Sequence, residues 1–425
     1  MNKYTSKLIL FICFILSFSS VSSAQVKLLI PMELSQTDHL KAYGIAYRHL
    51  LNGRELDWLL NYRGGAFMFG YSSELEDECK QKGVSYELIN GTQTAQVYAD
   101  VKDENSNMDV IRLEKVAKIA VYVPPNALPW DDAVTLALEY AEIPYEKLWD
   151  EEVLEGKLKG YDWLHLHHED FTGQYGKFYA AFHASDWYIA QQKLGEEMAA
   201  KLGYKKVSHL KLDVVKQIQN YVSNGGFLFT MCSGTDTYDI ALAVQNTDIC
   251  DVMYDGDPFD PLANDKLDYN ECLAFENFKI EMNPYVYEFS DIDITGDLVI
   301  MGESLDYFNL VDFSAKFDPV PTMLNQCHTA LIKGFLGQTS GFRKEFIKKS
   351  ITILALNEET DFVRYMHGNY GRGTFTFYSG HDPEDYQHMV GDPPTDLSRF
   401  KNSPGYRLIL NNVLFPAAKK KKLKT

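Results

Sequence analysis

Short apolar runs alternate with amphipathic stretches along most of the chain. The runs at 118–123, 161–168 and 227–231 have the length of buried strands and are bounded by glycine or polar residues. Between the last two, apolar residues recur at helical spacing through 211–222. Apolar strands joined by amphipathic helices predict an α/β fold with a mainly parallel sheet and helices on both of its faces.

The same pattern divides the chain into an N-terminal α/β segment at 25–114 and a larger domain at 115–416. In the first segment, strands at 26–32 and 56–61 flank a helix at 36–51, which we interpret as a βαβ pattern. A polar stretch centred on residues 103–107 predicts the boundary.

The larger domain carries an insertion and is followed by a charged tail. Residues 254–297 are acidic and rich in Asp, Asn and Pro, which predicts a long excursion, and a strand is expected at 297–301. Residues 417–425 are rich in lysine and predict a solvated basic tail.

The first 24 residues have the features of a secretory signal peptide. Lys3 and Lys7 precede an apolar run at 8–18, and small residues at 22–24 suit cleavage before Gln25. We therefore expect an exported protein, periplasmic or secreted, with no membrane span after cleavage. An uncleaved N-terminal membrane anchor is the alternative.

The net charge of the chain indicates which classes of molecule it can bind. The chain has 59 acidic and 41 basic residues, with a formal net charge of −18. Such an acidic protein is a poor partner for nucleic acid, because the phosphate backbone attracts basic surfaces. A small molecule, a glycan or a peptide is the expected ligand.

Cys232 stands where the predicted strand at 227–231 gives way to a turn and a helix. In α/β proteins such a turn exposes a nucleophile above the sheet edge, with Ser233 and Asp236 in the same turn as cleft residues. The alternative is a small buried core cysteine. After cleavage of the leader an odd number of cysteines would remain, so at least one thiol stays unpaired, although Cys250 could pair with Cys272.

A second strand, at 373–378, is followed by His381. Glu384 can hold that imidazole in one tautomer, and Asp382 or Asp385 could do so instead. Together with Cys232 these residues are the parts of a Cys-His-Glu triad. The alternative is a turn in which His381 caps the backbone.

Histidines and carboxylates also cluster where the strand at 161–168 ends. Strand alternation places His165 and His167 on one face, and His168 and Asp170 on the other. His165, His167 and Asp170 could bind a divalent metal, the one possible cofactor. Alternatively, His167, His168, Glu169 and Asp170 are the polar lining of a cleft.

Three of these regions resemble the class I glutamine amidotransferase-like superfamily. They are 118–123 with 130–134, 225–232 and 371–384, and the last is similar to the closing strand of the trehalose-utilisation (ThuA-like) branch. The resemblance covers about 115–416 and implies a flavodoxin-like fold. The elbow lacks the first glycine of Gly-x-Cys-x-Gly, and Asp382 interrupts the His-Pro-Glu motif, so the resemblance supports the fold more than the reaction.

The chain also resembles an exported bacterial family that carries the label asparagine synthetase B, most clearly at 34–44 and 165–176. That enzyme uses a cysteine exposed as residue 2, where this chain has Asn2. It also needs an ATP loop of the Ser-Gly-Gly-x-Asp-Ser type, which residues 233–237 match poorly. The residues therefore argue against asparagine synthesis.

Three hypotheses follow. The first is an exported hydrolase that acts on a carbohydrate, amide or peptide, with Cys232 as nucleophile, His381 as base and Glu384 as its orienter. The second is a ligand-binding module that kept the cleft and lost the chemistry. The third is a metal-dependent hydrolase built on the histidine cluster at 165–170.

Overall fold

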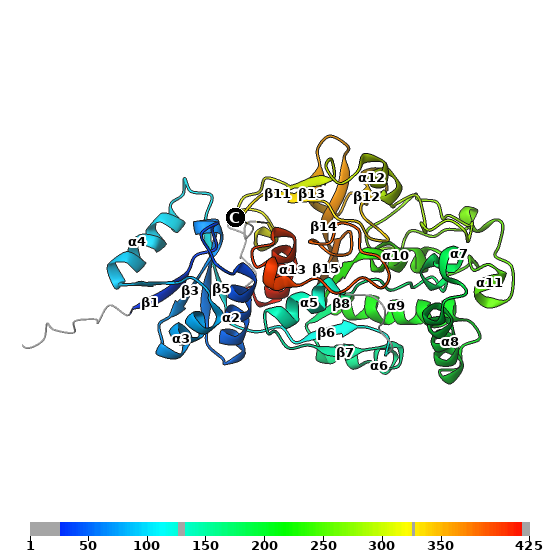
Figure 1. The fold of residues 1–425 in the computed structure, drawn as a ribbon, viewed down its shortest axis with the longest axis horizontal. Helices are drawn as coiled ribbons and strands as arrows, with labels where there is room; N and C mark the ends of the chain where they lie inside the picture. The colour runs from blue at the N-terminus through cyan, green and yellow to red at the C-terminus, as the bar shows by residue number, and fades with distance from the viewer. Residues whose placement is uncertain (1–25, 126–131, 325–327, 419–425) are drawn as a thin grey trace, which may run out of the picture.

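A computed structural model describes residues 26–125, 132–324 and 328–418. They form two β-sheets with helices packed against them (Figure 1). The α/β class predicted from the apolar pattern is confirmed. The predicted signal peptide at 1–24 lies outside the described residues, as does the basic tail beyond residue 418.

The N-terminal sheet has five strands in the order β4-β1-β3-β2-β5, and every pairing in it is antiparallel. In chain order its strands are β1 (Lys27–Ile30), β2 (Leu56–Leu60), β3 (Ala66–Gly70), β4 (Glu87–Ile89) and β5 (Asp109–Leu113). β1 and β2 are both antiparallel to β3, which lies between them, so they run parallel to each other. With the helix at 39–51 that joins them they form a βαβ unit, as the sequence pattern predicts, and β3 is inserted between its two strands.

Three helices cover the two faces of this sheet, and each begins at a side-chain cap. They are α2 (His39–Leu51), α3 (Ser73–Lys82) and α4 (Gly91–Lys102). Asp38, Ser72 and Asn90 accept hydrogen bonds from the first turns of these helices. Apolar residues of α2 and α3 pack on one face and those of α4 on the other. The polar stretch centred on residues 103–107, which predicts the boundary, thus lies between helix α4 and strand β5.

The large sheet has ten strands, of which nine follow the order β11-β10-β13-β14-β15-β9-β8-β6-β7, while β12 pairs with β14. One half is parallel and consists of β6 (Ile119–Tyr122), β7 (Glu146–Leu148), β8 (Trp163–Leu166), β9 (Phe227–Met231) and β15 (Gly373–Tyr378). The predicted strands at 118–123, 161–168, 227–231 and 373–378 are all in this half.

The other half of the sheet is antiparallel, so the prediction of a mainly parallel sheet is wrong. Its strands are β10 (Tyr307–Leu310), β11 (Leu331–Lys333), β12 (Phe342–Arg343), β13 (Thr352–Asn357) and β14 (Phe362–Tyr370). The expected strand at 297–301 is instead helix α12 (Thr295–Met301). Asp293 accepts a hydrogen bond from the Thr295 N–H, and Ile294 and Leu298 bury the same side of this helix.

Helices cover both faces of the parallel half. On one face lie α5 (Ala133–Tyr140) and α13 (Pro404–Leu414), and on the other α6 (Asp150–Leu154), α9 (Val207–Ser223) and α10 (Asp236–Ala243). The remaining helices are α7 (Tyr179–Phe182), α8 (Asp186–Lys201) and α11 (Val252–Asp255). Strand residues alternate between the two apolar clusters, as in a sheet that is buried on both faces.

The two sheets share one hydrophobic core, because α2, α5 and α13 pack between them (Figure 1). The fully buried Arg407 of α13 reinforces this junction. Its guanidinium donates to the carbonyl oxygens of Met32 and Gly64 and to the hydroxyl of Tyr43. The N-terminal sheet is therefore attached by both apolar packing and a buried charge.

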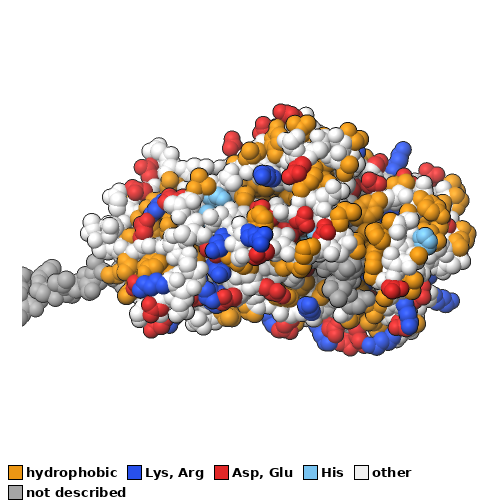
Figure 2. Space-filling model, viewed as in Figure 1, with side chains coloured by type: hydrophobic (Ala, Val, Ile, Leu, Met, Phe, Trp, Pro, Cys, Tyr) orange, Lys and Arg blue, Asp and Glu red, His pale blue; other side chains and the backbone are white. Residues whose placement is uncertain are grey.

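The described cysteines form no disulfide, and the charged side chains on the visible face are mixed in sign. Cys79, Cys232, Cys250 and Cys272 are free and buried, so Cys250 does not pair with Cys272, and Cys327 lies outside the described residues. On the face drawn in Figure 2, acidic and basic side chains are interspersed along the molecule. Within the described part of the chain, every helix is too short or too polar to cross a bilayer.

Candidate functional site

Three neighbouring strands of the large sheet end at the same edge. β15, β9 and β8 run parallel, with Tyr378 beside Met231 and Leu166 beside Thr230. The segments that follow these strands therefore meet, and ligands of open α/β sheets bind at this carboxyl edge. The three regions singled out in the sequence, around residues 167, 232 and 381, all lie here.

The turn after β9 holds its two neighbours in place. The Cys232 N–H donates to the Gly380 carbonyl at 3.2 Å, and the Gly234 N–H donates to the His167 carbonyl at 2.7 Å. A Cβ atom on Gly234 would lie 2.5 Å from that carbonyl oxygen, so only glycine permits this approach. The backbones that bear His167 and His381 are thus linked through the central turn.

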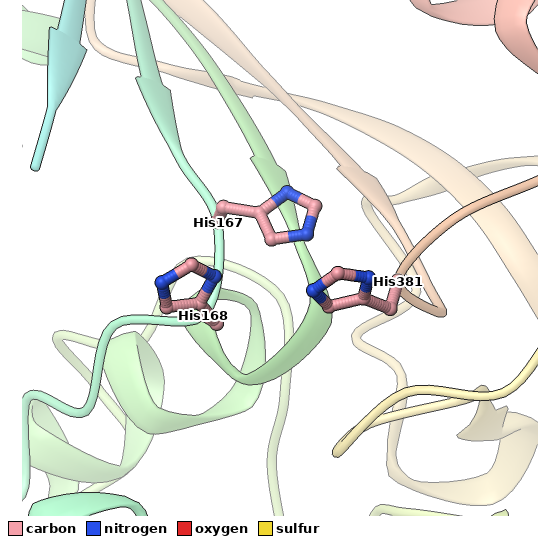
Figure 3. Close-up of side chains that lie close together, drawn as sticks. All are labelled: His167, His168 and His381. Carbon is pink, nitrogen blue, oxygen red and sulfur yellow. The ribbon is translucent and has the colours of Figure 1, made fainter. Parts of the chain in front are cut away.

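His167, His168 and His381 form the centre of the site. They can each offer one ring nitrogen such that all three nitrogens lie within 4.8 Å of one another. The rings of His167 and His381 have centroids 4.6 Å apart and are perpendicular, and those of His167 and His168 are 5.3 Å apart. Figure 3 shows the three rings around one space, with a nitrogen of each turned toward it. We call this group the histidine triad.

Asp132 stands behind the triad. Its Oδ1 atom lies 3.5 Å from Nδ1 of His167 and 3.3 Å from Nε2 of His165, and it also caps α5 by accepting from the Val134 N–H. A carboxylate on one imidazole nitrogen fixes the ring and leaves the other nitrogen for a metal. Both ring nitrogens of His167 are buried and make no hydrogen bond among the described residues, so at 3.5 Å the Asp132 carboxylate is a charged neighbour of this ring, and a small movement would make it a hydrogen-bond acceptor.

Burial determines the protonation state of His167 and His168. It lowers the pKa of His168 to about 4 and holds the pKa of His167 well below its usual value, although Asp132 opposes this shift. Burial raises the pKa of Asp132, but the facing His165 and His167 outweigh it and hold that pKa below its usual range. At neutral pH His167 and His168 are therefore neutral imidazoles beside an ionised carboxylate, the state in which histidine binds metals.

These residues fit a divalent transition metal. Three imidazoles with a carboxylate beside one of them suit Zn²⁺ and related ions, which three protein ligands hold while a fourth position stays open. Two nitrogens on one zinc lie about 3.3 Å apart, from a bond length of about 2.0 Å. Small ring movements bring nitrogens within 4.8 Å to that separation.

Buried polar contacts support the segment that carries His381. Arg364 of β14 pairs with Asp306 at 2.7 Å, and its Nε donates to the Ser379 hydroxyl at 3.1 Å. On its outer side, the ring of His381 stacks on His388 at 4.8 Å, and Nδ1 of His388 lies 3.0 Å from Asp385. The orientation of His381 is therefore constrained from two directions.

Cys232 adopts the backbone of an elbow, but burial disfavours its thiolate. Its φ of 50° is left-handed, which is uncommon for a residue with a side chain and occurs at strained functional turns. Burial raises the pKa of its thiol to about 11, against hydrogen bonds from backbone N–H groups that include Gln338 at 3.2 Å. At neutral pH the sulfur is therefore a thiol and not the nucleophilic thiolate.

The predicted residues at 165–170 have different roles in the structure. His165 to Glu169 lie at the triad or at a cavity beside it, whereas Asp170 serves a neighbouring turn. Asp170 accepts hydrogen bonds from Thr172 and from the Gly176 N–H, and it shapes that turn. Among the described residues, the ligand group that contains His165 and His167 is completed by Asp132 and not by Asp170. Glu169 lines a cavity together with His168.

The remaining predicted residues lie around the triad in supporting positions. The Asp236 carboxylate accepts from the Thr339 hydroxyl at 2.7 Å, and burial raises its pKa to about 7. Ser233 is fully buried in the turn after β9. Asp382 accepts from the Glu384 N–H at 2.9 Å, and burial raises the pKa of Glu384 while a hydrogen bond with Ser403 opposes it.

Sequence reasoning missed two residues of this site. Asp132 is the N-cap of α5, a local role that gives no sign of a site, and only the structure shows its carboxylate 3.5 Å from His167. His388 lies in an irregular segment without periodicity.

Comparisons with known proteins leave the family open. No family model matches the chain, and no curated protein matches it either. Two cytoplasmic proteins from Salmonella typhimurium are similar in structure at 11% identity, with a TM-score of 0.34, over 71% of this chain and all of theirs. A beta-galactosidase from Bacillus circulans sp. alkalophilus is similar at 13% identity and a TM-score of 0.28, over 83% of this chain and 36% of its own.

Proposed function

We propose that the protein is a divalent-metal-dependent hydrolase. His167, His168 and His381 hold the metal, and Asp132 positions His167. The observation that carries the proposal is the approach of three ring nitrogens within 4.8 Å at the carboxyl edge of the sheet. This is the third of the sequence hypotheses, with His168 and His381 in place of His165 and Asp170.

The environment of the triad favours a reactive centre over a purely structural one. A structural zinc site is closed by four protein ligands, whereas three histidines leave one position for water or substrate. A bound divalent ion supplies a hydroxide near neutral pH and polarises a carbonyl oxygen. Burial lowers the pKa of His167 and His168, and Asp132 and His388 pack against rings of the triad, which supports the orientation of the ligands at such a centre.

Metal titration of the purified full-length protein tests the proposal. The protein, stripped with a chelator, is titrated with Zn²⁺ and Co²⁺ by calorimetry, and Co²⁺ also reports its ligand geometry by visible absorption. We expect one tight site per chain in the unaltered protein and none in His167→Ala. His367→Gln is the matched control, because His367 is a buried histidine of the same sheet that bonds to Thr376. Binding that is equal in both variants would refute the triad as the metal site.

A cysteine hydrolase is the second candidate, and the left-handed φ of Cys232 is the observation that favours it. In that mechanism Cys232 is the nucleophile, His381 its base and Glu384 the orienter, on the flavodoxin-like, amidotransferase-like fold that the sequence resembles. Substrate binding would have to lower the pKa of the thiol from about 11.

Paired variants separate the two mechanisms. Hydrolysis of a panel of glycans, amides and peptides is measured for Cys232→Ala and for His167→Ala. The metal mechanism predicts that the first keeps activity and the second loses it. The reverse result would establish the cysteine mechanism. If neither the panel nor the metal titration gives a signal, the chain is better described as a ligand-binding module.

A further inference from the structure

A small cavity adjoins the histidine triad on the side of His168. Its volume is about 50 Å³, which is room for a few non-hydrogen atoms. Its walls come from the ends of β7 and β8 and from helices α8 and α9, and they are mostly apolar. The lining includes Trp149, His168, Glu169, Gln191, Gly195 and Lys211.

Two polar atoms on residues of this cavity are buried without a hydrogen-bond partner in the described chain. They are the indole Nε1 of Trp149, a donor, and the side-chain oxygen Oε1 of Gln191, an acceptor. Trp149 is only 8% exposed, so water reaches its N–H poorly. A buried donor or acceptor left unpaired costs about 1–3 kcal/mol, and a ligand that pairs with it recovers this free energy.

The charged residues of the cavity are mostly engaged elsewhere. Lys211 Nζ lies 2.9 Å from Asp150 Oδ1 and 2.9 Å from the Tyr122 hydroxyl, and it also sits 3.8 Å from the Trp149 ring centroid. Asp170 is occupied by its own turn. The lysine charge is thus neutralised within the protein, which argues against an anionic ligand, whereas Glu169 adds an acceptor to the wall.

From these observations we infer that the cavity is the acyl subsite of the metal centre and receives a small carboxamide group, such as the acetamido group of an N-acyl substrate. The amide carbonyl accepts from Trp149 Nε1, and the amide N–H donates to Gln191 or Glu169. The small volume favours an acetyl group over a long acyl chain. This inference rests on the proposed function and names its substrate class, N-acyl amides with a short acyl group.

Binding of small probes to the full-length protein tests the subsite apart from the chemistry. Acetamide, methyl acetate and butanamide are compared by ligand-observed NMR, with and without Zn²⁺. We expect acetamide to bind more tightly than the other two, because the ester lacks the N–H donor and the longer amide exceeds the cavity. Equal binding of acetamide and methyl acetate, or tighter binding of butanamide, would overturn the inference.

Three conservative variants localise the effect. Trp149→Phe removes the N–H but keeps a ring, and Gln191→Met removes the amide; each should weaken acetamide binding about fivefold or more. Gly195 is in helix α8 and lines the cavity, and in Gly195→Ala the added Cβ lies 3.3 Å from the Tyr175 ring. Alanine favours the helix, so the protein should stay folded while the smaller cavity binds acetamide less tightly. Affinities unchanged in all three variants would overturn the subsite.

The two proposals fail in different ways. If metal titration finds no site while acetamide binding still depends on Trp149, the proposed function fails and the carboxamide subsite stands. If the metal binds to the triad but acetamide does not bind to the unaltered protein, the subsite is wrong and the metal centre stands.

Discussion

Two groups of buried or half-buried histidines stand out in the described part of the chain, and one of them has the properties that suit a metal site. In the histidine triad, His167 and His381 meet at 4.6 Å between ring centroids. At the junction of the two sheets, His39 and His328 stack at 4.2 Å. Ring proximity and burial are therefore similar, and they do not separate a metal centre from a structural contact.

The hydrogen-bond partners of the ring nitrogens separate them. Nδ1 of His39 lies 3.0 Å from the Asn402 side-chain oxygen, and its Nε2 lies 3.0 Å from the Met32 carbonyl. His328 faces the guanidinium of Arg407 at 3.1 Å, a fixed positive charge that repels a cation. His167 instead faces a carboxylate on one side and other imidazoles on the other. We therefore expect a metal at the cluster whose charged neighbour is a carboxylate and not at the one beside a fixed positive charge.

The largest expected effect comes from removing one histidine from each group. His381→Ala should lower Zn²⁺ affinity by more than about 100-fold, because it deletes a ligand and not merely a supporting contact. His328→Ala should leave the affinity unchanged, because its ring neighbours Arg407. Calorimetric titration of both variants checks this pair, and a similar loss in each would show that the two groups do not differ as argued.

Arg407→Met addresses the junction and should lower the free energy of unfolding by about 3 kcal/mol. The substitution keeps much of the apolar side chain but leaves buried carbonyl oxygens of Met32 and Gly64 without their donor. Urea denaturation measures the loss. Zn²⁺ affinity of the folded variant serves as the control, and we expect it to be unchanged.

Asp132→Asn is a milder test at the triad. The amide keeps the size of the side chain but removes the charge that faces His165 and His167, so metal affinity should fall by about 10–100-fold. Asp170→Asn is the matched control, because that carboxylate serves a turn and should not affect the metal. Affinity that falls only in the Asp170 variant would restore the ligand set predicted from the sequence.

The smallest expected effect is a pH dependence of the free energy of unfolding that arises from His39 at the junction of the two sheets. Burial, aided by the charge of Arg407, lowers the pKa of His39 to about 4 from an ordinary value of 6.5. Below pH 6.5 the unfolded chain therefore binds a proton that the folded protein excludes, and stability falls as the pH drops from 6.5 toward 4. At pH 5.5 the loss is about 1 kcal/mol.

His39→Gln should remove that part of the pH dependence. Unfolding free energies of the variant and the unaltered protein, measured by urea denaturation at pH 7.5 and 5.5, check the difference between their slopes. Equal slopes would show that His39 is protonated in the folded protein.

Much of the secondary structure follows from local pattern. Helix α13 (Pro404–Leu414) begins where local signals favour a helix start, since Ser403 caps it and Pro404 suits its first turn. The strands that end near His167, Cys232 and His381 are also where apolar runs placed them. Strand direction could not be predicted in this way, because β14 and β15 have the same kind of apolar run whether their neighbours are parallel or antiparallel.

The chain sequence alone determines that reactive side chains follow three buried strands, because apolar runs and the polar turns after them are local properties. It also indicates both histidine motifs, at 165–168 and at 381. Only the tertiary structure places His381 against His167, since their contact depends on the strand order β15-β9-β8 and on burial over both faces of the sheet. For the same reason Asp132, a helix cap in the sequence, becomes the carboxylate behind the triad only when α5 packs against β8.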